Sequence, residues 1–483
     1  MQGKNEHSVA TNFSYNLIYQ VIAIIVPIIT TPYVSRILSP ESIGAFSYTQ
    51  SICSYFTFFS IIGTDIYGQR EIAFCRDDKE KRSSVFWEIF FIRFIGVVIC
   101  TIPYLMISFI ADELKRELLL IQTISVIGNI FNIVYLLQGV ENFKLLLLRN
   151  IIVKLISILS IFVFVKQESD LWIYVLISVS SVVVGNITLW FNLKKYVNFI
   201  PIHKLKYFRH IKPSFALFIP TIALRLYDVF DKTMMGYILN ATTENGYYEQ
   251  ALKIITISIT VVTSLGNVML PRVASLFAAN DKDQIKNHIY KSFDVVWLLS
   301  IPIAFGIIGV ADNMVPWFFG AGYKKVALLL QFFAIICIPM GLKNVIGIQY
   351  LIPTKQQRKY TASIVAGLII NIILNLFMIP LFQAIGAIIA SIISECCIVL
   401  IQSYMIKNQL SFIESVKSAP NKVIAAFVML TALLVSSNYL ASSVINTIVL
   451  TIGGMIVYVS VLLFLHDKMT MNILKRFTKK FHK

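Results

Sequence analysis

Three charged residues share one face of an apolar segment at residues 214–238. Arg225, Asp228 and Lys232 are separated by three and four positions, so on an α-helix they lie within about 60° of one another. The rest of the segment is apolar enough to lie in a membrane. A charge in hydrocarbon is energetically costly, so such charges face a bundle interior or a water-filled cavity. The pattern therefore predicts a polar chamber inside a membrane protein.

Charged residues also occur in other apolar segments, and cations outnumber anions among them. A positively charged, desolvated chamber attracts an anion such as a phosphate or a carboxylate. Buried carboxylates can titrate when burial raises their pKa, which would allow coupling to protons or Na⁺. The expected cavity cations are Arg93, Lys154, Arg225, Lys232, Lys253 and Lys343, and the ion-coupling candidates are Glu88, Asp228, Asp231 and Glu395.

Several of these residues also have a structural interpretation. Glu88 lies near one end of its apolar segment, where its carboxylate could reach the membrane surface. Asp228 could neutralise Arg225 as an ion pair within one helix. Lys253 begins a polar stripe with threonines at spacings of three and four residues, and such a stripe either holds helices together or lines a pore. The sequence leaves these alternatives open.

The cysteines and histidines form no recognisable metal or disulfide pattern. The chain has six of each, and no two cysteines have the CxxC spacing. Five of the cysteines lie inside apolar segments, and no HExxH sequence occurs. We therefore expect no disulfide framework, no metal site and no cofactor.

The composition places the chain in a membrane. Of its 483 residues, 57% are hydrophobic and 14% are charged, and a soluble protein of this length cannot hide so much apolar surface. A transmembrane helix needs about 20 mostly apolar residues. We predict an all-α polytopic membrane protein with about fourteen spans, at 13–34, 43–63, 85–110, 118–138, 145–165, 171–193, 214–238, 249–270, 292–311, 326–352, 359–380, 384–406, 422–440 and 443–466.

The positive charges behind the net charge of +17 are unevenly distributed between the two sides of the membrane. Alternate loops contain 30 Lys and Arg residues on one side of the membrane and 6 on the other. The basic side faces the cytoplasm, so we expect both termini there. The same excess suits the anionic lipids of the inner leaflet, and we expect no nucleic-acid partner. The N-terminus lacks a signal-peptide pattern, so the first span would direct insertion.

One long basic connection, residues 194–213, divides the chain into six helices before it and eight after it. It mixes Lys, Arg and aromatic residues in the way of an interfacial helix. Matching Pro, Gly, Tyr and Gln positions around helices 1 and 7 favour two six-helix lobes that arose by duplication. The predicted domains are an N-lobe at 1–193, a cytoplasmic amphipathic linker at 194–213, a C-lobe at 214–406, and two peripheral helices with a basic tail at 407–483.

Six motifs resemble those of bacterial polysaccharide repeat-unit flippases. The first follows the S-R-x-L-G-P-E-x-x-G signature after helix 1, with Ser39 in place of the usual Gly. The third has Tyr135 where the family usually has Trp. The resemblance extends over nearly all of residues 12–406. The motifs read SRILSPESIGAFSYTQ (35–50), GTDIYGQREIA (63–73), YLLQGVENFKLLLLRN (135–150), YDVFDKTMMGY (227–237), GYYEQALKI (246–254) and VMLPRVA (268–274).

This resemblance implies the fold of the multidrug/oligosaccharidyl-lipid/polysaccharide exporter superfamily, with two lobes around a central cavity. It further implies flipping of undecaprenyl-pyrophosphate-linked oligosaccharides from the inner to the outer leaflet of the bacterial cytoplasmic membrane. Flipping would proceed by alternating access and use an ion gradient. It would serve O-antigen, capsule or exopolysaccharide synthesis, where a polymerase and a chain-length regulator could be partners. Four arginines within or beside these motifs, here called the motif arginines, are also candidate functional residues, although they could instead cap helices. They are Arg36, Arg70, Arg149 and Arg272.

Three other functions compete with this one. A drug or cation antiporter of the same fold would favour a net-anionic, aromatic chamber, whereas the charges in these spans are net cationic. A membrane-embedded glycan polymerase or glycosyltransferase usually needs a large outer loop or a soluble domain, and neither is present, so we expect no enzyme. A scaffold that transports nothing would leave the charges within the spans unexplained.

Overall fold

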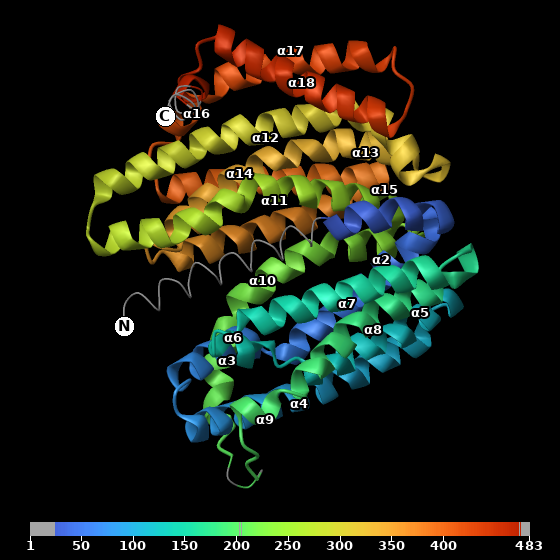
Figure 1. The fold of residues 1–483 in the computed structure, drawn as a ribbon, viewed down its shortest axis with the longest axis vertical. Coiled ribbons are helices and arrows are strands. Elements are labelled where there is room, and N and C mark those ends of the chain that lie inside the picture. Colours follow the sequence, from blue (N-terminus) through green and yellow to red (C-terminus); the bar gives the residue numbers. More distant parts are fainter. Residues whose placement is uncertain (1–24, 202, 204, 473, 475–483) are drawn as a thin grey trace. The chain divides into compact units, whose positions relative to one another are not determined.

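The computed structural model describes residues 25–201, 203, 205–472 and 474. These residues form helices and contain no β-strand, which confirms the all-α prediction. The chain divides into two compact units, Met1–Gly236 and Tyr237–Lys483 (Figure 1). The domain boundaries expected from the sequence stay a prediction. In this division, the helix that we expected to open the C-lobe belongs almost entirely to the first unit.

The first unit is a bundle of helices preceded by helical residues 25–37. Its long helices are connected by short ones, and a 3₁₀ turn at Asn129–Phe131 interrupts the predicted span 118–138. The helices are α2 (Pro40–Ile61), α3 (Thr64–Phe74), α4 (Lys79–Ile110), α5 (Glu113–Gly128), α6 (Val134–Gly139), α7 (Phe143–Phe164), α8 (Leu171–Trp190), α9 (Leu193–Tyr196) and most of α10 (Phe208–Ile238).

The second unit contains the remaining helices. A π-helical turn at Val345–Leu351 continues α14, so residues 325–351 together make one span. The helices are α11 (Thr243–Ala278), α12 (Lys282–Phe319), α13 (Lys325–Phe333), α14 (Cys337–Asn344), α15 (Gln357–Met405), α16 (Phe412–Val416), α17 (Ala419–Ser437) and α18 (Val444–Phe464).

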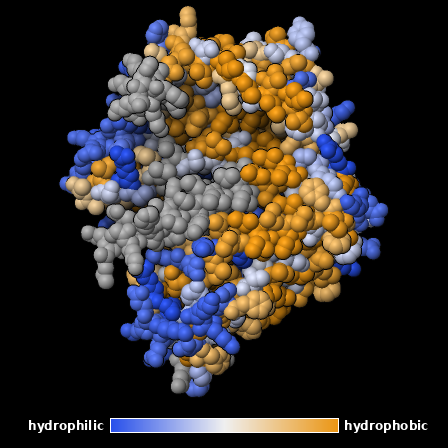
Figure 2. Space-filling view, in the orientation of Figure 1, coloured by the Kyte–Doolittle hydropathy of each residue, from blue (hydrophilic) through white to orange (hydrophobic). Residues whose placement is uncertain are grey.

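Ten helices within the described residues are long and apolar enough to cross a membrane, so the chain is a multi-pass membrane protein. Figure 2 shows apolar side chains over much of the visible face, with hydrophilic side chains gathered toward helix ends. Every predicted span from 43–63 onward overlaps a described helix. The total of fourteen spans stays a prediction. Residues 13–24 of the first span and both extreme termini, which we expected in the cytoplasm, lie outside the described residues.

The helix α15 is a hairpin of two arms. Its 49 residues would measure about 74 Å if straight, more than twice the hydrocarbon thickness. Gln383 interrupts it with φ 55° and ψ −131°. Across the hairpin, the Asn371 side-chain amide donates to Ser391 Oγ at 3.3 Å, and that of Gln402 donates to Ser363 Oγ at 2.9 Å. The two arms match the predicted spans 359–380 and 384–406.

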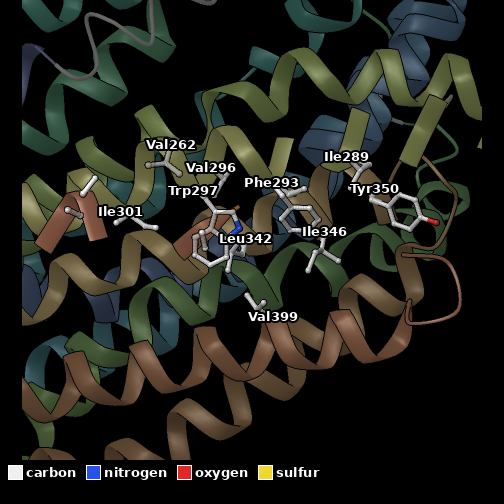
Figure 3. Close-up of a cluster of buried hydrophobic side chains, with 14 of the residues drawn as sticks. Val262, Ile289, Phe293, Val296, Trp297, Ile301, Leu342, Ile346, Tyr350 and Val399 are labelled. Carbon is white, nitrogen blue, oxygen red and sulfur yellow. The ribbon is translucent and has the colours of Figure 1, made fainter. Parts of the chain in front are cut away.

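The core of the second unit surrounds α12. Figure 3 shows the rings of Phe293 and Trp297 among apolar side chains such as Leu342 and Ile346. The indole of Trp297 donates to the carbonyl oxygen of Ser415 at 2.8 Å, which joins α12 to α16. The last two helices pack against α12 and leave much of their own surface exposed. This placement agrees with the expectation that they are peripheral.

The carboxylate of Glu168, from another loop, accepts hydrogen bonds at the N-terminus of α2. Ser39 is the N-cap, and its Oγ accepts the Ser42 backbone N–H at 3.2 Å. The Ser39 N–H and hydroxyl both donate to Glu168 at 2.7 Å, and the Ser42 hydroxyl also donates to Glu168. Hydroxyl caps and nearby carboxylates both stabilise a helix N-terminus. A glycine at position 39 would have no hydroxyl for two of these bonds, so the departure from the family motif has a structural role here.

A buried ion pair between Lys422 and Asp467 holds the chain at the end of the last helix. This pair predicts that the stability of the protein depends on pH. Burial alone would raise the pKa of Asp467, but the Thr470 N–H and the Lys422 ammonium outweigh it and lower this pKa. A carboxylate with a lowered pKa stabilises the fold above its unfolded pKa, and this stability is lost as the pH falls through the folded pKa. We expect the thermal unfolding temperature in detergent to fall below about pH 4, and Asp467→Asn to flatten that fall. An unchanged pH profile in the variant would contradict this role.

Candidate functional site

A cavity of about 260 Å³ lies between α2 and α10 in the first unit. The side of α2 is polar, and the side of α10 brings two of the predicted cavity cations. Hydroxyl, amide, guanidinium and ammonium groups therefore line one space. The lining residues are Ser47, Gln50, Ser51, Ser54 and Phe58 from α2, and Arg225, Val229 and Lys232 from α10.

The polar stripe of α2 was not predicted from the sequence, because its residues carry no charge. Its lining residues recur at spacings of three, one, three and four residues, which keeps them on one helix face. The regular spacing of these uncharged residues was the sequence signal that could have revealed the stripe. The stripe also explains why α2 is not among the ten helices of the described residues that are long and apolar enough to cross a membrane.

Contacts along both ends of the cavity hold α10 antiparallel to α2. Toward one end, Thr233 Oγ1 lies 2.8 Å from Ser51 Oγ and accepts the Tyr55 hydroxyl at 2.8 Å. Toward the other end, the rings of Phe59 and Phe218 have centroids 5.7 Å apart. The two cations therefore project from a helix that is fixed above and below them.

The two cations lie seven residues apart, so their backbone positions are separated by about 10 Å along α10. Arg225 is exposed to the cavity, and its guanidinium lies 5.5 Å from the centroid of the Phe58 ring. Lys232 is half-buried, and Asp231 beside it is buried. The side chain of Asp228 lies outside the described part of the structure, so the ion pair of Asp228 with Arg225 stays an open alternative.

This arrangement suits a small anion attached to a hydroxylated group. Arginine and lysine form the strongest charge-assisted hydrogen bonds with phosphate or carboxylate oxygens. The serine hydroxyls and the Gln50 amide can donate to and accept from sugar hydroxyls. The volume holds a diphosphate-sized group or about one sugar ring, not a whole oligosaccharide.

Arg93 lies in a different place, inside a buried network. Its side chain is 1% exposed, and it donates to Thr64 Oγ1 at 2.8 and 3.1 Å. It also bonds to Asp65 and to the carbonyl of Asn132, and it lies 5.0 Å from the Tyr135 ring centroid. The geometry favours a structural role, in which Arg93 joins α3 and α4 to the break after α5.

Lys343 and Glu395 form an ion pair in the second unit. The Lys343 ammonium lies 2.7 Å from Glu395 Oε1, and the Glu395 side chain is 0% exposed. Glu395 Oε2 has no hydrogen-bond partner within the described residues. The predicted cation is therefore neutralised by the predicted coupling carboxylate, and one carboxylate oxygen stays available to a proton or a cation.

Two further predicted cations are not among the residues that line the cavity. Lys154 is half-buried on α7. Lys253 belongs to the second unit and donates to Gln250 Oε1 at 3.2 Å. Substrate contact at these positions stays a prediction.

Glu88 is buried among residues of the linker. Arg209 Nη2 donates to Glu88 Oε2 at 2.7 Å, and His210 Nε2 lies 2.6 Å from the same oxygen. Of the interpretations left open for Glu88, the geometry does not support the one in which its carboxylate reaches the membrane surface, because its side chain is 1% exposed. Ion coupling at Glu88 stays a prediction. These partners are about 120 residues away in the chain, so no pattern within one segment reveals them.

The motif arginines have mixed surroundings. Arg149 Nε donates to the carbonyl of Gly185 at 2.8 Å, and Nη2 donates to Asn186 Oδ1 at 2.5 Å, so it joins α7 to α8. Arg70 pairs with the adjacent Glu71. Arg36 and Arg272 are exposed. The geometry favours the structural interpretation for Arg149, and functional roles for these arginines stay predictions.

A glycine fixes the approach of α10 to the α2–α3 junction. Gly63 has φ 72°, and a Cβ added there would lie less than 3.0 Å from the backbone oxygen of Ser214. We expect Gly63→Ala to destabilise the protein by about 1–3 kcal/mol, since both strain and the clash oppose it. Thermal unfolding in detergent measures the loss. Gly453→Ala is the control, because no atom lies within 4 Å of its added Cβ. Equal stability of the two variants would contradict the close contact.

A family model described as a polysaccharide biosynthesis protein matches residues 9–277. A candidate O-antigen transporter of Escherichia coli (strain K12) is 26% identical over 410 residues, which cover 84% of this chain and 98% of that relative. The family match spans both the cavity helices and the motifs quoted above.

Two solved structures share the fold. A lipid II flippase MurJ in an inward closed conformation matches with a TM-score of 0.75 and 16% identity, over 95% of this chain and 100% of its own. An inward-facing multidrug resistance transporter of the MATE family matches with a TM-score of 0.60 and 12% identity, over 86% and 99% of the two chains. These likenesses confirm the predicted superfamily fold and concern the fold alone.

Proposed function

Because this chain belongs to the family of polysaccharide biosynthesis proteins, we propose that it flips undecaprenyl-pyrophosphate-linked oligosaccharide repeat units from the inner to the outer leaflet of the bacterial cytoplasmic membrane. The observation that carries the proposal is the cavity in which Arg225 and Lys232 of α10 face the hydroxyl and amide groups of α2. The name of the Escherichia coli relative, an O-antigen transporter, points to the same class of substrate.

The physical problem of flipping matches this cavity. A sugar and a pyrophosphate cannot cross hydrocarbon unaided, whereas the polyprenyl tail can stay in it. In our proposal, Arg225 and Lys232 bind the pyrophosphate, and Ser47, Gln50 and Ser54 contact the first sugar. The rest of the glycan extends beyond the cavity, which is too small to enclose it.

Alternating access and ion coupling complete the proposed mechanism. Glu395 is the strongest coupling candidate, since it is a buried carboxylate with one oxygen lacking a partner within the described residues. Asp231 is buried beside the cavity cation Lys232. Protonation or Na⁺ binding at such groups would change the charge balance within a unit and so favour one conformation. The polymerase and the chain-length regulator of O-antigen, capsule or exopolysaccharide synthesis are the proposed partners.

A drug or cation antiporter is the second candidate, since the MATE transporter shares the fold. The charges of the cavity oppose it. Among the lining residues that the structure describes, a cationic drug would meet a guanidinium and an ammonium, and the one aromatic ring, Phe58, already lies 5.5 Å from the Arg225 guanidinium.

Reconstituted transport tests the proposal. The full-length protein is placed in proteoliposomes with a fluorescent lipid-linked oligosaccharide, and a membrane-impermeant periodate reagent reports glycans that reach the opposite leaflet. We expect protein-dependent exposure of the glycan and no efflux of a cationic dye. Dye efflux without glycan exposure would overturn the proposal in favour of the antiporter.

A further inference from the structure

A buried carboxylate in the first third of α4 binds both the linker and the first turn of α10. Glu88 Oε1 accepts the backbone N–H of Lys206 at 2.8 Å. Oε2 accepts Arg209 Nη2 at 2.7 Å and lies 2.6 Å from His210 Nε2. Glu88 is 1% exposed and His210 is 3% exposed. A buried carboxylate with this many donors is fixed in place, and so are its partners.

The same helix also binds the linker further upstream. Arg82 Nε donates to the carbonyl of Tyr196 at 2.8 Å. Ser83 Oγ accepts the Asn198 N–H at 2.8 Å, and the Trp87 indole donates to the Asn198 carbonyl at 2.9 Å. The described residues of the linker do not form one helix, although its composition is typical of an interfacial helix. It contains the short α9, and side chains of α4 hold its backbone.

A second helix holds the other side of His210. The Tyr67 hydroxyl of α3 lies 2.7 Å from His210 Nδ1. Burial raises the pKa of Tyr67, so the phenol keeps its proton and can donate. Four residues after His210, Ser214 contacts Gly63 at the α2–α3 junction so closely that no side chain would fit there. The start of α10 is thus fixed by α3, by α4 and by this junction.

The start of α10 needs such external contacts. Pro213 and Pro220 lie within the helix, and each removes one backbone donor from its early turns. Arg225 and Lys232 follow on the same helix. A rotation of α10 by about 20° would move a side-chain tip roughly 8 Å from its axis by about 3 Å. That displacement exceeds the range of a hydrogen bond to a bound anion.

We propose that Glu88 is a positioning residue for anion binding: through Arg209 and His210 it sets the orientation of α10, and hence the direction in which Arg225 and Lys232 face the cavity. This inference rests on the proposed function for its consequence in transport. The mechanical part of this inference is that Glu88 orders α10 as far as Lys232. This part does not depend on what the substrate is.

Hydrogen–deuterium exchange of the full-length protein in nanodiscs tests the mechanical part. In Glu88→Gln, we expect exchange about tenfold faster than in wild type at residues 206–214 and also at 222–234. Glu80→Gln is the matched control, since Glu80 is exposed on the same helix and its loss should leave both regions unchanged. Faster exchange confined to 206–214 would overturn the proposal, because Glu88 would then hold the linker only.

A second variant covers the case in which Glu88→Gln does not fold. Arg209 has a 52% exposed side chain, so Arg209→Gln should insert and fold, and it should show the same two-region increase at a smaller amplitude. Absence of any increase at 222–234 in this variant would equally overturn the proposal.

Binding of farnesyl diphosphate then separates positioning from a local structural role. We expect Glu88→Gln to weaken binding about fivefold or more although it touches no cavity residue, Glu88→Asp to recover part of the loss, and Glu80→Gln to bind like wild type. Unchanged affinity in Glu88→Gln would overturn the positioning role. If wild type itself binds no diphosphate, the proposed function fails, while the exchange measurement still decides whether Glu88 orders α10.

Discussion

Replacing Arg225 and Lys232 together by glutamine is expected to lower flipping of the lipid-linked oligosaccharide about a hundredfold. Both side chains line the cavity between α2 and α10, and each charge-assisted hydrogen bond to a phosphate contributes roughly 1.5–3 kcal/mol. Glutamine keeps much of the side-chain length but removes the positive charge. The initial rate of glycan exposure in proteoliposomes, normalised to inserted protein, measures the effect.

A charge-matched variant controls for the loss of net charge. Arg116 and Lys195 are exposed cations of the same unit that lie outside the cavity. Arg116→Gln combined with Lys195→Gln should keep at least about half of the wild-type rate, since surface charges act weakly through salt. An equal fall in the two double variants would mean that overall charge, and not the cavity, binds the substrate. Arg225→Lys should retain part of the rate, because it keeps the charge and loses the paired donors.

Replacing Glu395 alone by glutamine is expected to destabilise the protein by about 3 kcal/mol, because it leaves the Lys343 ammonium without its charged partner. The pair is 2.7 Å long, and Glu395 is fully buried. Unfolding in detergent, followed by intrinsic fluorescence, measures the change. We also expect transport by any folded fraction to lose its dependence on pH or on Na⁺.

The double variant Lys343→Met, Glu395→Leu distinguishes the two roles of this pair. It removes both charges and keeps similar volumes, so most of the lost stability should return. If Glu395 couples transport to an ion, the stable double variant will still lack the pH or Na⁺ dependence. Wild-type dependence in the double variant would contradict coupling at this position and leave a structural pair.

The helices could be predicted from the sequence because their signal is local. About 20 apolar residues between basic loops are enough to place a span, and each such segment from 43–63 onward overlaps a described helix. The hairpin near Gln383 was also predictable, since the mostly apolar stretch 359–406 is about twice as long as one span requires. The division into units was harder to predict from the sequence. It depends on the helices that α10 packs against, and these place α10 in the first unit although it follows the linker.

The candidate site was predicted in part. The spacing of Arg225 and Lys232 on one face needs only helical geometry, and both line the cavity. Other charges have partners distant in sequence: Asp65 and Asn132 for Arg93, and Glu395 for Lys343. No periodicity within one segment reveals such pairs. The polar face of α2 was missed for a different reason, since hydroxyl and amide groups are common in spans and do not stand out beside charge.

The Glu168 contact at the beginning of α2 has a consequence for where an anion can stop. The exposed N–H groups of a free helix N-terminus attract phosphate. Here the carboxylate of Glu168 already takes the hydrogen bonds of Ser39 and Ser42 and places a negative charge at that point. The Glu168 carboxylate therefore disfavours anion binding at the N-terminus of α2, whereas Arg225 and Lys232 favour it beside the middle of this helix.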